Sequence, residues 1–151
     1  MSPLDESTSR EFVRTRRFAY LLLVVAPMIY LIVPVIHEPE SPIAGEDDLL
    51  FYILLIVAIL QPLIIPIIER MQIAAFRKQT EKRMLPAQLY TSIAFIRFAI
   101  VESIYIFGLV VYLVSSDLPR MGWFYFVGII WTFVHWPRMV GFQRFMERME
   151  L

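Results

Sequence analysis

The sequence predicts an all-α integral membrane protein with four transmembrane helices, both termini cytoplasmic and a C-terminal amphipathic helix. The 151-residue chain is 58% hydrophobic and 19% charged, and its apolar residues form four runs. A helix needs about 20 mostly apolar residues to cross the roughly 30 Å hydrocarbon core of a bilayer. Because the links between the runs are short, we expect residues 1–151 to form a single four-helix transmembrane domain.

The first two expected spans, residues 18–36 and 49–68, contain no charged residue. Before the first span, Thr8-Ser9-Arg10-Glu11 fits a capping box, which predicts that a helix starts with Thr8 as its cap. No small-residue cleavage site follows this span, and this favours a membrane helix over a signal peptide. After the second span, residues 69–85 are expected to continue the helix until Pro86 interrupts it.

The third expected span covers residues 89–114, and the fourth covers 121–136, a short and aromatic run. In the tail, residues 138–151, large apolar side chains recur every three or four residues opposite a face of arginine and glutamate. These apolar residues are Met139, Phe142, Phe145, Met146 and Met149. The pattern predicts an amphipathic helix that either lies among the lipid headgroups or packs against a partner subunit.

The basic residues predict the topology. All of them except Arg97 and Arg120 lie in the N-terminal flank, in the link between spans two and three, or in the tail. The link between spans one and two has five acids and no lysine or arginine. Because basic flanks stay on the cytoplasmic side, we expect both termini and the central link to be cytoplasmic, in a multi-pass protein of a prokaryotic cytoplasmic membrane. Basic clusters beside spans indicate topology, so we expect no nucleic-acid partner.

Four polar residues within the spans are the candidate ion-handling residues: Glu102, Arg97, Gln61 and Tyr105. A charge at the bilayer centre costs at least about 2.5–3.5 kcal/mol, so Glu102 needs a partner, a proton or a water-filled cavity. Arg97 and Glu102 point roughly 140° apart around their helix, which makes pairing between them unfavourable. Arg97 either extends toward the membrane surface or meets a group on another span. Glu102 is either protonated or hydrogen-bonded to Gln61, Ser103 or Tyr105.

At these residues the chain resembles the proteolipid c subunits of rotary ATP synthases. The resemblance covers about residues 70–114: a basic link, then PAQLYTSIAFIRFAIVESIYIFGLVVYLV with an acid in mid-span. It implies that Glu102 corresponds to the ion-carrying carboxylate of that family. The chain departs from the family at Arg97 and in span two, which has no glycine and a single alanine.

The sequence contains no phosphate-binding glycine loop, nucleophile elbow or HExxH motif. We therefore expect no enzyme activity, catalytic residue, cofactor or metal site. The favoured function is a structural or accessory subunit of a larger membrane complex. One alternative is a proton- or cation-handling protein that uses Glu102, and another is a quinone- or lipid-binding protein that uses the aromatic fourth span. The expected partners are the lipid bilayer and either other membrane subunits or further copies of this chain.

Overall fold

Long helices lying side by side account for nearly all the residues that the computed structural model describes, which are 6–36, 47–78 and 85–150. This part of the chain contains no strand. It has three helices that are long and apolar enough to cross a membrane, namely Thr8–Ile36, Asp48–Lys78 and Pro86–Ser115. The prediction of an all-α protein with several apolar helices that suit a membrane is therefore confirmed.

The first helical rod contains a widened turn beside a proline. It comprises α1 (Glu6–Tyr20), a π-helical turn (Leu21–Val25), α2 (Ala26–Tyr30) and α3 (Val33–Ile36). Pro27 has no N–H to donate and its ring crowds the preceding turn, so a local π-helical turn accommodates it. The expected cap at Thr8 is wrong, because α1 already includes Glu6.

The second rod contains a tightened turn beside another proline. It comprises α4 (Asp47–Leu60), a 3₁₀ turn (Gln61–Ile64) and α5 (Ile65–Lys78). Pro62 is buried at this 3₁₀ turn. The expected helical continuation of span two is confirmed as far as Lys78, and residues 79–84 lie outside the described chain.

The third and fourth rods form a tight hairpin, α6 (Pro86–Ser115) followed by α7 (Leu118–His135). Pro86 occupies the first turn of α6, where the missing N–H costs nothing. Between the helices, Ser116 adopts a left-handed conformation with φ 54°. The Asp117 carboxylate then accepts a hydrogen bond from the backbone N–H of Arg120, at 3.1 Å, and caps α7. The short turn makes α6 and α7 antiparallel neighbours.

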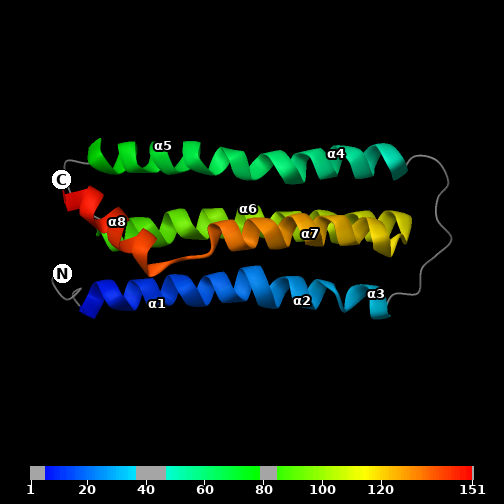
Figure 1. The fold of residues 1–151 in the computed structure, drawn as a ribbon, viewed down its shortest axis with the longest axis horizontal. Helices are drawn as coiled ribbons and strands as arrows, with labels where there is room; N and C mark the ends of the chain where they lie inside the picture. Colours follow the sequence, from blue (N-terminus) through cyan, green and yellow to red (C-terminus); the bar gives the residue numbers. More distant parts are fainter. Residues whose placement is uncertain (1–5, 37–46, 79–84, 151) are drawn as a thin grey trace.

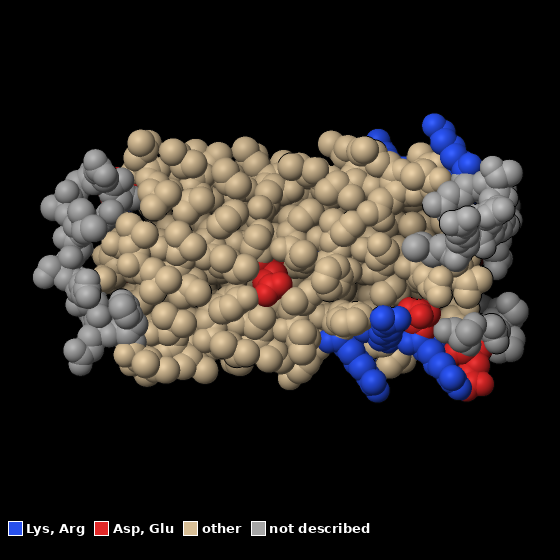
Figure 2. Space-filling model, turned by 180° about the vertical axis from the view of Figure 1, so that it is seen from behind, with Lys and Arg blue, Asp and Glu red and all other residues tan. Residues whose placement is uncertain are grey.

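Figure 1 shows three layers, with α4 and α5 on one side, α1 to α3 on the other, and α6 and α7 between them. The two termini lie at the same end of the molecule. On the face seen in Figure 2, basic side chains lie toward one end only. The helix α6 contacts every other long rod, so it organises the positions of all the polar side chains described below.

The C-terminal helix α8 (Met139–Glu150) is amphipathic, as predicted, but its apolar face packs against its own chain. Phe142 is fully buried, and its ring centroid lies 5.3 Å from that of Phe12 and 4.8 Å from that of Tyr90. Phe145 is also buried against Tyr90. These two rings therefore pack within their own chain. The ends of α1 and α6 supply the apolar surface that covers them. The location of α8 among lipid headgroups or against a partner subunit stays a prediction.

Candidate functional site

Glu102 lies near the middle of α6 and is only partly buried. Its Oε1 atom accepts a hydrogen bond of 2.7 Å from the Tyr30 hydroxyl on α2. Within the described chain, no other donor contacts this carboxylate. The π-helical turn before Pro27 sets the rotation of α2, and so directs Tyr30 toward α6. One oxygen of Glu102 is therefore hydrogen-bonded inside the protein. The other is free to bind a proton or a cation, or to accept a hydrogen bond from another donor.

Glu102 belongs to a stripe of residues along the outer side of α6, spaced alternately three and four apart. The outer α6 stripe consists of Ser92, Phe95, Ala99, Glu102, Ile106, Leu109 and Leu113. Such spacing places all seven side chains on one helical face. Phe95, Ile106 and Leu113 are 48%, 39% and 49% exposed. The stripe is thus apolar along its length except for the serine at its start and the carboxylate at its centre.

The space-filling view shows how isolated a charge is on this side of the molecule. In Figure 2 an acidic surface lies near mid-length among uncharged residues, apart from the charged side chains that lie toward one end of this face. Lipid tails can cover the apolar members of the stripe, but they offer no hydrogen bond to a carboxylate. The charge, rather than the exposed apolar area, is the unusual feature of this face.

Gln61 does not contact Glu102. Its amide nitrogen donates to the Ile100 carbonyl, at 2.9 Å, and to the Ser103 hydroxyl, at 2.8 Å. Ser103 in turn donates to the same carbonyl. The 3₁₀ turn at Pro62 places Gln61 against α6, where it ties the second rod to the third. The expected bond between Gln61 and Glu102 is wrong, because Gln61 meets a different face of α6.

Tyr105 is also directed away from Glu102. Its hydroxyl lies 2.9 Å from the Thr132 hydroxyl on α7, and its ring meets Tyr125 edge-on at 5.1 Å between centroids. The Tyr105 side chain is buried between α6 and α7. The expected contact of Tyr105 with Glu102 is therefore wrong, and Tyr105 is part of the α6–α7 interface.

Arg97 meets a group on another helix, which was one of its two expected arrangements. Its guanidinium donates to the Glu69 carboxylate on α5 at 2.7 Å, with 21% and 29% of the two side chains exposed. The Arg97 Nε atom is buried and has no hydrogen-bond partner in the described chain. As expected, Arg97 does not pair with Glu102.

The four candidate residues therefore do not form one cluster. Each contacts a different partner, and these contacts join α6 to the first rod, the second rod and α7. Tyr30 and Glu69, which bind Glu102 and Arg97, were not among the residues predicted from the sequence. For Glu69 a signal existed: it lies nine residues before Lys78, and Arg97 lies eleven residues after Pro86. At 1.5 Å per residue, both are about 14–17 Å from the same end of an antiparallel pair. Nothing in the sequence marks Tyr30.

Comparison with known proteins returned no matching family model, no matching curated protein and no matching solved structure. The resemblance to proteolipid c subunits stays a prediction. Within the described residues, no group of three or more histidine, aspartate or glutamate side chains is placed to hold a metal ion.

Proposed function

We propose that this protein is an accessory subunit of a larger membrane complex, and that it binds its partner through the outer α6 stripe. The observation that supports this proposal is the position of Glu102, which is partly exposed at mid-length on an apolar face with one internal donor, Tyr30. A partner helix with a donor or cationic side chain at the same depth would satisfy the second oxygen. Polar side chains commonly hydrogen-bond across packed membrane helices.

A different chain fits this face better than a second copy of the same one. Two α6 stripes facing each other would bring two Glu102 carboxylates together in a medium of low dielectric constant, where like charges repel strongly. A partner with a complementary side chain avoids that cost.

We further propose four membrane spans, with α7 as the fourth and both termini in the cytoplasm. The 18 residues of α7 are about 27 Å long, close to the thickness of the hydrocarbon core. This helix packs along α6 and exposes apolar side chains such as Phe126, Ile130 and Phe133. The shared end of the termini in Figure 1 agrees with an even number of spans.

The topology predicts which positions a membrane-impermeant maleimide reaches in intact cells. The chain has no cysteine, so single cysteines are specific labels. We expect labelling of Leu118→Cys, at the outer end, and no labelling of Ser9→Cys or Glu147→Cys until the membrane is opened. Labelling of all three positions in intact cells would contradict the topology. As a control, labelling of Leu118→Cys in opened membranes confirms that this position is reactive.

Photocrosslinking tests the docking face directly. A photoreactive residue in place of Phe95 or Ile106 should yield a discrete crosslinked product with another chain in native membranes. The same residue in place of Ile53 on α4, which is exposed to a similar degree at 49%, should yield none. In the Phe95-labelled protein, we expect Glu102→Leu to lower the yield about fivefold or more and Glu102→Gln to preserve it, since an amide still accepts a hydrogen bond. Equal yields at all three labelled positions would contradict the docking face.

The second candidate function is proton or cation handling at Glu102. The same unsatisfied oxygen favours it, because a carboxylate that faces outward at mid-membrane can exchange a proton or an ion. Native mass spectrometry after gentle extraction separates the two functions. A complex with different chains would favour the accessory subunit. A homo-oligomer whose Glu102 reacts with a carbodiimide in a pH-dependent manner, suppressed by a cation, would favour ion handling.

A further inference from the structure

Arginine side chains surround a cavity of about 580 Å³ between α5, α6 and α8. Arg97 contributes from α6, Arg138 precedes α8, and Arg144 and Arg148 lie one turn apart on α8. Among the residues that the structure describes, a single acid, Glu69, lines the same space. Four guanidinium groups against one carboxylate make this cavity strongly positive, so its ligand must be an anion.

Arg138 and the two arginines of α8 are available to bind a ligand. No ion pair in the described chain involves Arg138, Arg144 or Arg148. Arg97 shares one terminal nitrogen with Glu69, and its Nε remains buried without an acceptor. Guanidinium groups present several donors in a planar fork that matches phosphate oxygens. The cavity therefore has unsatisfied donor capacity of the kind that binds a phosphate group.

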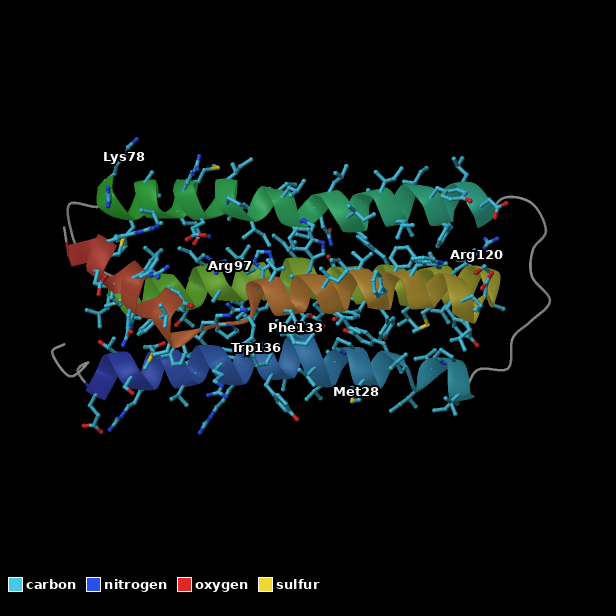
Figure 3. All side chains as sticks on the ribbon, viewed as in Figure 1. Met28, Lys78, Arg97, Arg120, Phe133 and Trp136 are labelled. Carbon is cyan, nitrogen blue, oxygen red and sulfur yellow. The ribbon has the colours of Figure 1, made fainter. Side chains whose placement is uncertain are left out.

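The cavity lies at the level where the apolar segments end. The apolar run of the second rod stops at Ile68, and Trp136, which follows the last residue of α7, lines the cavity together with Tyr90 and Phe145. Figure 3 shows Arg97 between α5 and α6, near the end of α7 where Trp136 lies. Tryptophan is enriched at the boundary between headgroups and hydrocarbon. A ligand here has its anionic group at headgroup depth and apolar surface beside it.

We propose that this cavity binds the phosphate of an anionic phospholipid headgroup. Its volume is in the range of small-molecule sites, and basic pockets between membrane helices suit anionic headgroups. A free phosphate ion shares the phosphate chemistry, but it would make no use of the aromatic walls or of the adjacent bilayer. This inference does not depend on whether the outer α6 stripe binds a partner.

Lipid binding by the purified full chain, measured by native mass spectrometry, tests the proposal. We expect phosphatidylglycerol to bind in preference to phosphatidylcholine. The double variant Arg144→Gln/Arg148→Gln should weaken phosphatidylglycerol binding about tenfold or more, because both guanidinium groups lie at the cavity. The matched variant Arg10→Gln/Arg70→Gln removes the same charge from exposed positions outside the cavity and should change binding less than about twofold.

Two outcomes would overturn the proposal. Equal weakening by both double variants would show that net charge alone attracts the lipid. Free phosphate would be the ligand instead if two results were obtained together. Millimolar inorganic phosphate would displace the lipid, and phosphate would raise the unfolding temperature of the protein but not that of Arg144→Gln/Arg148→Gln. Because all four substituted arginines are solvent-exposed, we expect both variants to fold, and their unfolding temperatures without added lipid check this directly.

Discussion

Replacing Gly128 with alanine should lower the free energy of unfolding by about 1–3 kcal/mol, the usual cost of overpacking a core. A Cβ atom at this position would lie 2.6 Å from Cζ and 2.7 Å from Cε1 of Tyr105. The Tyr105 ring has nowhere to move, because it is 2% exposed and its hydroxyl and ring edge are engaged by Thr132 and Tyr125. The substitution would therefore push α7 away from α6. Thermal unfolding in a mild detergent measures the effect.

Gly108→Ala tests the same interface one turn nearer the connection between α6 and α7, and it should also lower the free energy of unfolding. Its Cβ would lie 2.8 Å from the Cβ of Phe124 and 3.3 Å from the Met121 carbonyl oxygen, atoms that move only with the backbone of α7. Gly122→Ala is the matched control, since nothing lies within 4 Å of its added atom. That variant should be neutral or more stable, because alanine favours a helix by about 0.5–1 kcal/mol over glycine. Similar losses for all three variants would contradict the close packing of α6 and α7.

Glu69→Ala should have the second large effect, a loss of about 2 kcal/mol in the free energy of unfolding. The variant leaves the Arg97 guanidinium mostly buried, with no carboxylate at 2.7 Å. Removing one partner of a fully buried ion pair costs about 3–5 kcal/mol. Because 21% and 29% of these side chains remain exposed, solvent screens part of that cost. Reversible unfolding in detergent, followed by circular dichroism, gives the value.

An exposed ion pair on α1 provides the control for this prediction. Glu6 and Arg10 are 80% and 77% exposed, so Glu6→Ala should cause no measurable loss. Exchanging the buried pair, as Glu69→Arg with Arg97→Glu, should recover part of the stability that Glu69→Ala loses. If Glu69→Ala and Glu6→Ala behave alike, the contact between Arg97 and Glu69 contributes nothing to folding.

The sequence was sufficient to predict which polar residues lie within the apolar helices, but not which groups they contact. The sequence shows that Glu102 and Arg97 lie on one apolar helix, and that their angular separation prevents pairing. Which groups meet them depends on the rotation of α2 and α5, and prolines alter that rotation. The π-helical turn before Pro27 directs Tyr30 to Glu102, and the 3₁₀ turn at Pro62 directs Gln61 to Ser103. Helical periodicity assumes regular turns, so it cannot anticipate these contacts.

The apolar runs, the prolines and the basic clusters were sufficient to predict an all-helical chain with several membrane-length helices, because a backbone inside lipid must satisfy its own hydrogen bonds. Only the tertiary structure shows which helices pack against one another. It placed Phe142 of α8 against Phe12 and Tyr90, and it gathered Arg97, Arg144 and Arg148 around one cavity. These contacts join residues that are far apart in the chain. They depend on which helices become neighbours, and hydrophobicity, being non-directional, does not specify that.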